Sequence, residues 1–208
     1  ISASPEAATK VISVLLSGTI RQFRKSSGFL AQVVQWGENA SRRVITDELT
    51  GIYNRAFLDD AIENFFNISR SNYKPVSLLM LDVDNCRRVN ESISHEAGNR
   101  VISEFALIIK DIISRKGIIA RYGGDEFSIL LPETNREQAI DIAEIIRETI
   151  ESHDFSKILG KTGIKITTSI GVSSFPETAS ELAHFKEKAD ASLYRAKESG
   201  KNRVACVD

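Results

Sequence analysis

The order of apolar patterns in this chain limits its fold more than any other feature. Residues 76–83 form an almost unbroken apolar run, which predicts a buried central strand. Residues 101–116 then carry apolar side chains at helical spacing, which predicts an amphipathic helix. Residues 117–132 follow as two short predicted strands, joined by a tight turn at Gly123-Gly124.

Five more segments complete the pattern. Residues 54–69 predict a helix with Asn54 as its N-cap, and residues 139–150 show the apolar face of another helix. Residues 164–172 alternate like a strand, residues 182–199 predict a helix, and residues 203–207 a last strand. The order β-α-β-β-α-β, with additions at both ends, is that of the split βαβ, ferredoxin-like plan. The expected fold class is therefore α+β: a palm-type central antiparallel sheet flanked by helices, with an N-terminal helical extension.

This topology brings acidic residues together. The third strand of the plan lies between the first two and is antiparallel to both, so its hairpin tip lies beside the end of the first strand. Asp125 and Glu126 should then lie next to Asp82 and Asp84. Converging carboxylates are costly unless a cation joins them, and Mg²⁺ takes oxygen ligands and recruits phosphate oxygens. These residues predict metal-assisted nucleotidyl transfer on a nucleoside triphosphate; the alternative is that each acid is a solvated turn residue.

The composition argues against several function classes. Of the 208 residues, 42% are hydrophobic and 26% are charged, which is typical of a soluble globular protein. Lys and Arg number 27 against 28 Asp and Glu, so no basic excess favours a nucleic-acid partner. The apolar runs are too short to cross a bilayer, and we expect no membrane contact by this chain. Its two cysteines form no disulfide framework, which favours the cytoplasm, with the cytosolic part of a larger membrane-bound protein as the alternative.

Residues 1–46 are expected to be a helical linker or signalling segment, ahead of a globular domain over residues 47–208. The chain begins at Ile1 and its only methionine is Met80, so we expect it to be a piece of a longer protein. Apolar residues over 29–40 recur at the spacing of a short coiled coil. The alternative, a helix docked on its own domain or the tail of a missing one, stays open.

Five ordered stretches resemble the motifs of the GGDEF-domain family, the diguanylate cyclases. The resemblance implies condensation of two GTP into cyclic di-GMP, with release of pyrophosphate, by a homodimer in which each protomer presents one GTP to the other. It also implies a sensor or receiver domain upstream. The stretches are DELTGIYNR (47–55), LMLDVD (79–84), RYGGDEF (121–127), TTSIGVSSF (167–175) and ADASLYRAKESGKNRV (189–204).

The resemblance also implies roles for the acidic residues. Asp82 and Asp125 match the family's metal ligands, and the backbone carbonyl of Val83 matches the remaining ligand that the protein supplies. Glu126 matches the acid that assists deprotonation of the 3′-hydroxyl or holds a second metal. Asp84 has a weaker claim, with a structural role as an equal alternative. The implied cofactor is Mg²⁺, with Mn²⁺ as the alternative.

Further positions match the family's contacts with the nucleotide. Gly123 and Gly124 let the backbone approach it. Lys197 and Lys201 match basic positions that contact the triphosphate, and their spacing of four predicts one shared helix face. Without the motif around them, such a pair would be ordinary solvated surface. Arg87 stands where the family usually has Lys.

The segment after LDVD departs from the family pattern. Asn90 matches the residue that hydrogen-bonds guanine. The family has Phe at the position of Cys86 and Asp at the position of Asn99. We predict that both of these residues also bind the substrate. A carboxylate can accept both guanine donors, whereas an amide offers one acceptor and one donor. Asn99 therefore predicts reduced selectivity for GTP over ATP, unless local contacts compensate. We interpret His95 as a structural contact of this segment and not as a general base.

Three functions remain open at this level. They are an active diguanylate cyclase, a catalytically weak GTP-binding module that regulates a partner domain, and a cyclase with a mixed product. The altered segment over residues 86–99 supports the second, and Asn99 supports the third. No product-inhibition site is expected, because Ser114–Gly117 stands where many members carry R-x-x-D.

Overall fold

The computed structural model describes residues 45–207. The predicted helical segment over residues 1–46 therefore lies outside the described residues, apart from its last two. Those two are not helical, since Thr46 forms an isolated antiparallel bridge with Tyr53. The division of the chain into a linker and a domain stays a prediction.

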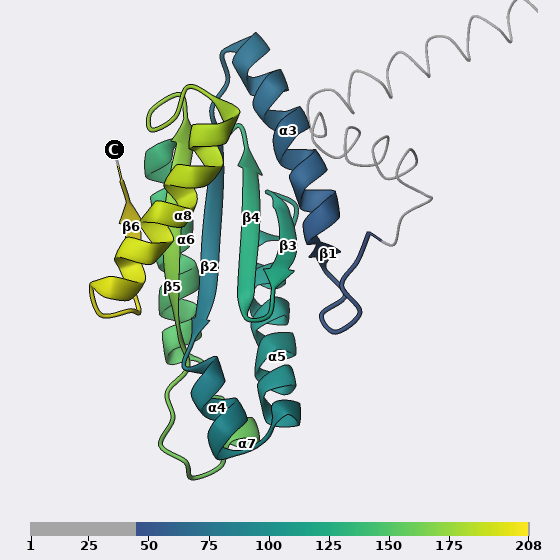
Figure 1. Ribbon diagram of the computed structural model, residues 1–208, viewed down its shortest axis with the longest axis vertical. Helices are drawn as coiled ribbons and strands as arrows, with labels where there is room; N and C mark the ends of the chain where they lie inside the picture. Colours follow the sequence, from purple (N-terminus) through teal and green to yellow (C-terminus); the bar gives the residue numbers. More distant parts are fainter. Residues whose placement is uncertain (1–44, 208) are drawn as a thin grey trace, which may run out of the picture. The chain divides into compact units, whose positions relative to one another are not determined.

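One six-stranded sheet runs through the described part of the chain (Figure 1). Its order is β1-β3-β4-β2-β5-β6, and the four inner strands pair antiparallel. β1 and β6 add to the two edges in parallel. The central antiparallel sheet expected from the sequence is confirmed, and the parallel edges were not foreseen. The strands are β1 (Tyr53–Asn54), β2 (Val76–Asp84), β3 (Ile118–Gly123), β4 (Glu126–Pro132), β5 (Thr167–Phe175) and β6 (Val204–Cys206).

Helices cover both faces of this sheet. α3 and α8 lie on one face, here called the front face, and α5 and α6 lie on the opposite, back face (Figure 1). The short helices α4 and α7 both lie at one end of the sheet, and each contacts α5 (Figure 1). The helices of residues 45–207 are α3 (Arg55–Asn72), α4 (Cys86–Ser92), α5 (His95–Ile113), α6 (Arg136–Ser152), α7 (Ser156–Leu159) and α8 (Leu182–Glu198).

The strand order confirms the ferredoxin-like plan. β4 lies between β2 and β3 and is antiparallel to both. The elements β2, α5, β3, β4, α6 and β5 form the βαββαβ core, and the remaining elements add to it. The fold is therefore the α+β, palm-type class that the apolar patterns predicted.

Side chains along β2 alternate between the two faces of the sheet. Leu79, Leu81 and Val83 belong to the hydrophobic cluster of the back face, together with residues of α5 and α6. Because successive side chains of a strand point to opposite faces, Met80 and Asp82 face the front. The side chains of β2 that face the front therefore include an acidic residue near the end of the strand.

Local capping signals explain where two of the helices begin. Asn54 caps α3, as predicted, because its Oδ1 accepts a hydrogen bond from Phe57 N (3.1 Å). Ser94 Oγ caps α5 by accepting from Ala97 N (3.1 Å). The sequence pattern predicted no helix over residues 86–92, so α4 was missed. The helix Cys86–Ser92 has seven residues, only two of them buried, and its first turn lacks a side-chain cap, so it has little apolar periodicity to detect.

α8 packs directly on the backbone of β5 at Gly171. A Cβ added at this position would overlap the backbone nitrogen of Leu193 and the backbone oxygen of Ala189. Backbone atoms cannot rotate away as the end of a side chain can. Glycine at this position therefore fixes how close α8 lies to the sheet.

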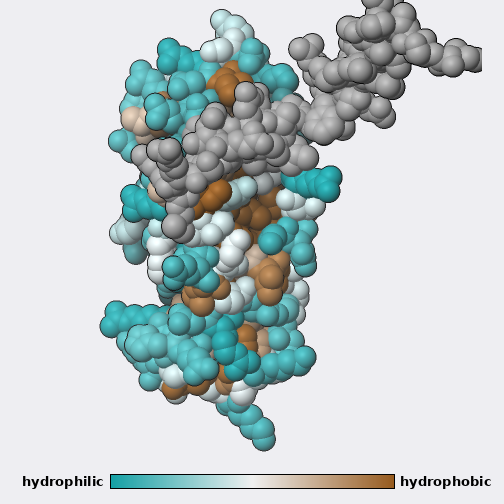
Figure 2. Space-filling model, turned by 90° about the vertical axis from the view of Figure 1, so that its right-hand side faces the viewer, coloured by the Kyte–Doolittle hydropathy of each residue, from teal (hydrophilic) through white to brown (hydrophobic). Residues whose placement is uncertain are grey.

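Large hydrophobic side chains at the surface come from several elements. Figure 2 shows the side that carries α3 and α5, where hydrophobic patches are interrupted by hydrophilic residues. Single exposed apolar residues of this kind are normal for a folded domain. Within residues 45–207, no helix has both the length and the apolar character that a membrane span needs. In the described part of the chain, the exposed large hydrophobic residues are Ile68, Tyr73, Ile93, Leu107, Ile145 and Tyr194.

The substitution Gly171→Ala should destabilise the domain by about 1–3 kcal/mol, because the added methyl group forces α8 away from β5. Urea denaturation followed by circular dichroism measures this change in the free energy of unfolding. Gly123→Ala is the matched control: no atom lies within 4 Å of its added Cβ, so the change should stay within about 0.5 kcal/mol. Equal stabilities of the two variants would contradict the close packing of α8.

Candidate active site

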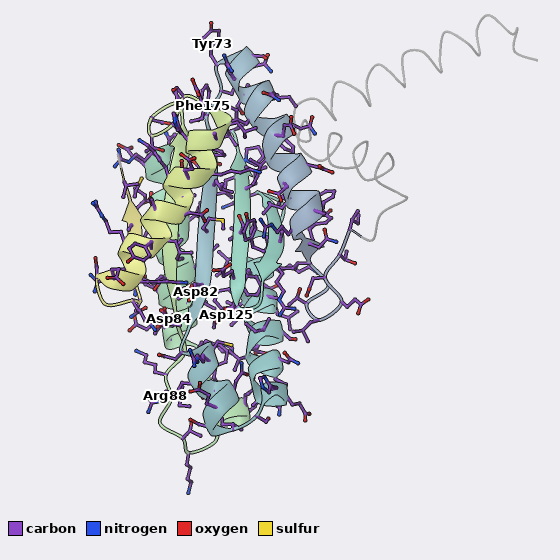
Figure 3. The ribbon with its side chains drawn as sticks, in the orientation of Figure 1. Tyr73, Asp82, Asp84, Arg88, Asp125 and Phe175 are labelled. Atoms are coloured by element: carbon purple, nitrogen blue, oxygen red, sulfur yellow. The ribbon has the colours of Figure 1, made fainter. Side chains whose placement is uncertain are left out.

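The ends of β2 and β4 bring the predicted acidic residues together. Asp82 lies directly opposite Glu126 in the antiparallel register, and the Val83 N–H donates to the Asp125 carbonyl (3.1 Å). Residues opposite one another in a ladder share a face, so Asp82 and Glu126 both lie on the front face. Figure 3 shows Asp82, Asp84 and Asp125 close together at this end of the sheet. The two acidic stretches therefore meet, as the topology predicted.

Asp82 forms an ion pair with Lys197 of α8. Lys197 Nζ lies 2.6 Å from Asp82 Oδ2, and the two side chains are 31% and 14% exposed. Burial raises the pKa of Asp82; the hydrogen bond and charge of Lys197 oppose the rise, and the charges of Asp125 and Asp84 add to it. The net pKa lies above the usual value of an aspartate. The carboxylates thus create a negative potential that favours a cation at this place.

Asp84 has a structural role. It is 1% exposed, and both of its oxygens accept hydrogen bonds. The hydroxyls of Thr167 and Ser169 on β5 donate to Oδ2 (2.7 Å) and Oδ1 (2.9 Å), and Asn202 N donates to Oδ2 (3.1 Å). These bonds tie the end of β2 to β5 and to the segment before β6. Of the two roles left open by the sequence, the contacts of Asp84 favour the structural one.

Arg121 holds the turn at Gly123-Gly124. Its Nε and Nη2 donate to the Gly124 carbonyl (2.9 and 2.7 Å), while its Nη1 lies 3.2 and 3.1 Å from the two carboxylate oxygens of Asp47. Asp47 Oδ1 also accepts from Thr50 N (3.0 Å) and Thr50 Oγ1 (2.7 Å). The motif that opens the domain and the motif of the hairpin are therefore one hydrogen-bonded unit.

Sequence reasoning missed Asp47 and Arg121 as positioning residues. Partial burial alone would raise the pKa of Asp47, but the hydrogen bonds from Thr50 and the charge of Arg121 outweigh it, and the pKa lies below its usual value. The two residues are 74 positions apart, so no local spacing links them. The only available signal was that both charges stand inside the recognised motifs.

Lys201 does not share a helix face with Lys197, so that prediction was wrong. α8 ends at Glu198, with Ser199 as its C-cap. Gly200 and Lys201 then have φ values of 111° and 62°, which take the chain out of the helix. The helix predicted over residues 182–199 also ends before Lys201, so a spacing of four did not by itself place both lysines on one helix; the pair Ser199-Gly200 is the stop signal in the sequence.

Two of the three predicted substrate-binding residues on α4, Cys86 and Arg87, lie in different settings. Cys86 is 5% exposed and belongs to the back-face cluster. Burial, together with the charges of Asp125 and Asp82, raises the pKa of its thiol to about 11, so the thiol is protonated at neutral pH. Arg87 is 89% exposed, and its Nε donates to Glu91 Oε1 (2.8 Å). Contacts of Cys86 and Arg87 with a substrate stay predictions.

Asn90 and Asn99, the predicted base contacts, lie where α4 meets α5. The side chain of Asn90 packs against Gly98, at which an added Cβ would overlap Asn90 Oδ1. Asn99 follows Gly98 on α5 and lines a cavity of about 550 Å³. His95, the first residue of α5, is exposed, and its role stays a prediction. Other residues that line the cavity include Leu49, Ser103, Glu104, His153, Phe155 and Ile158.

The oxygen donors at the strand ends suit a hard divalent cation. Asp82 and Asp125 offer carboxylates, and Val83, which follows Asp82 on β2, offers a backbone carbonyl. Among residues 45–207, no three His, Cys, Asp or Glu side chains are grouped closely enough to hold a metal alone. Mg²⁺ is usually bound by one or two carboxylates together with substrate phosphates. The residues therefore fit a metal that is shared with a nucleotide.

Comparisons with known proteins find relatives that match most of the described chain. A family model described as "Diguanylate cyclase, GGDEF domain" matches residues 44–203. The response regulator PleD of Caulobacter vibrioides is 32% identical over 160 residues, which are 77% of this chain and 35% of that protein. Diguanylate cyclase A of Treponema denticola is 37% identical over 145 residues, which are 69% of this chain and 38% of that protein. The chain thus spans well under half the length of these relatives.

A solved structure shares the fold. The GGDEF domain of DgcB from Caulobacter crescentus, determined in complex with c-di-GMP, superposes with a TM-score of 0.71 at 29% identity. The match covers 78% of this chain and 95% of that one. It agrees with the α+β class derived from the strand order.

Proposed function

This chain belongs to the GGDEF-domain family of diguanylate cyclases, and we propose that it condenses two molecules of GTP into cyclic di-GMP. In each of two steps, the 3′-hydroxyl oxygen of one GTP forms a bond to the α-phosphorus of the other. The bond between that phosphorus and the oxygen that bridges to the β-phosphate breaks, and pyrophosphate leaves. Two such steps close the ring and release two pyrophosphates.

The observation that carries this proposal is the meeting of two acidic strand ends. Asp82 lies opposite Glu126, and the backbone hydrogen bond of 3.1 Å between Val83 and Asp125 fixes the neighbouring residues. Members of this family act with a divalent metal. We propose Mg²⁺, with Mn²⁺ as the alternative, held by Asp82, Asp125 and the Val83 carbonyl. When bound, the metal neutralises phosphate charge and makes the attacking hydroxyl more acidic.

Other side chains of the site bind and orient the substrate. Glu126, on the same face as Asp82, accepts the proton of the 3′-hydroxyl. Lys197 reaches the phosphates from α8, and Lys201 reaches them from the turn after that helix. Arg87 joins them if its side chain leaves Glu91, and its high exposure permits that movement. These cations balance the negative charge of a triphosphate.

The base and the backbone of the nucleotide contact different elements. Asn90 on α4 and Asn99 on α5 hydrogen-bond the base, and Cys86, buried in the first turn of α4, supports this segment from the core. Gly124 has a φ of 42°, in the left-handed region that glycine adopts readily, and the space beside Gly123 is open. The turn that Arg121 holds can therefore come close to the phosphates.

The reaction requires two copies of the chain, because each protomer holds one GTP. A homodimer places the two nucleotides face to face, which replaces a collision by a fixed orientation. An upstream sensor or receiver domain would control this pairing. We place the site in the cytosol, where GTP is available.

Incubation of the purified protein with GTP, ATP and Mg²⁺, followed by mass spectrometry of the products, tests this function. We expect cyclic di-GMP from GTP. Glu126→Gln should lower the rate about 10²- to 10⁴-fold, because the proton acceptor is lost. Asp111→Asn is the matched control. It removes an exposed carboxylate on α5 and should leave the rate unchanged.

Two outcomes would contradict the proposal. Tight GTP binding without any product would favour a regulatory, catalytically weak module. An undiminished rate in Glu126→Gln would remove that residue from the chemistry.

Asn99 favours a second possibility, a cyclase with reduced base selectivity. An amide keeps one hydrogen bond to guanine but loses the charge-assisted pair that a carboxylate makes. Asn99→Asp should therefore raise the ratio of GTP to ATP turnover roughly 5- to 150-fold, as expected for about 1–3 kcal/mol. Parallel rate measurements with the two nucleotides give this ratio. A strict preference for GTP that Asn99→Asp does not change would rule out the role of Asn99 in selectivity.

A further inference from the structure

Lys197 and Asp82 form the most direct contact between a cation and the acidic strand ends. Lys197 Nζ lies 2.6 Å from Asp82 Oδ2, a short, charge-assisted hydrogen bond. Asp82 is largely buried, whereas Lys197 keeps about a third of its side chain exposed. The ammonium therefore occupies one oxygen of a carboxylate that the proposed function assigns to the metal.

Lys197 is placed there by the packing of α8. It lies in the last turn of α8 (Leu182–Glu198), which Gly171 allows to pack against the backbone of β5. At that distance its side chain spans from the helix to the end of β2. Because a lysine is a flexible chain with a mobile charge, it can leave Asp82 without any movement of the helix.

A divalent cation and an ammonium group compete for the same carboxylate. Both are attracted to Asp82 and repel each other when they share it. A free metal ion would have to displace the Lys197 ammonium and leave it without a counter-charge. A metal ion that arrives with a triphosphate brings several negative charges, and these can accept Lys197 as it leaves Asp82.

We propose that Lys197 makes metal binding conditional on the nucleotide: it holds Asp82 until the triphosphate arrives and then transfers to the phosphates. This inference rests on the metal site of the proposed function. It adds that the metal ion and the nucleotide bind to that site together, and that the metal ion without a nucleotide binds weakly.

Titration of the nucleotide-free protein with Mn²⁺ tests the proposal, with free Mn²⁺ measured by electron paramagnetic resonance. Lys197→Met should bind Mn²⁺ at least about 10-fold more tightly than the wild type, because its competitor is gone. A gain in affinity that requires Asp82 does not arise from misfolding, and the double variant below tests that requirement. Lys201→Met is the matched control, because it removes a nearby positive charge but no contact with Asp82, and it should change the affinity much less.

The double variant Asp82→Asn/Lys197→Met should not show the increased Mn²⁺ affinity, since the carboxylate itself is missing. Equal Mn²⁺ affinity of Lys197→Met and the wild type would overturn the proposal, as would an equal gain in Lys201→Met. A parallel titration with a non-hydrolysable GTP analogue separates this failure from failure of the metal site. If Mn²⁺ binds with the analogue and depends on Asp82, the site stands and only the role of Lys197 is refuted. If Mn²⁺ binding never depends on Asp82, the proposed metal site itself is wrong.

Discussion

The antiparallel register between β2 and β4 is the constraint on which the site depends. It sets Asp82 opposite Glu126 and aligns Val83 with Asp125 through a backbone hydrogen bond. A slip of one residue would turn Asp82 toward the apolar back face, where a carboxylate has no partner. The apolar residues Leu79 and Leu81 therefore fix the chemistry as well as the core, because they decide which face the acid occupies.

Two further contacts hold this end of the sheet in place from opposite sides. On one side, Arg121 links the Gly124 carbonyl to Asp47 and fixes the turn that presents Asp125. On the other, Gly171 admits α8 closely enough for Lys197 to reach Asp82. Neither the hydrogen bonds of Arg121 nor the packing at Gly171 is part of the reacting centre. Each orients a group that is, which is how a rigid scaffold makes a site precise.

The fold and the meeting of the acids could be predicted because they follow from strong, regular patterns. The apolar run over residues 76–83 and the hairpin over 117–132 leave few topologies open. α4 escaped detection because a short helix with few buried residues has little periodicity. The pairing of Asp47 with Arg121 could not be predicted, since it exists only once distant strands are assembled. The wrong prediction for Lys201 shows that a spacing of four residues gives a shared helix face only where the helix extends over both residues.

The central claim is that Asp82 and Asp125 together hold a divalent cation on the phosphates of a nucleotide. Crystals grown with Mn²⁺ and a non-hydrolysable GTP analogue, measured by anomalous diffraction, locate that cation directly. We expect an anomalous peak about 2.1 Å from a carboxylate oxygen of each aspartate. An ordered analogue whose metal peak touches neither Asp82 nor Asp125 would contradict the claim.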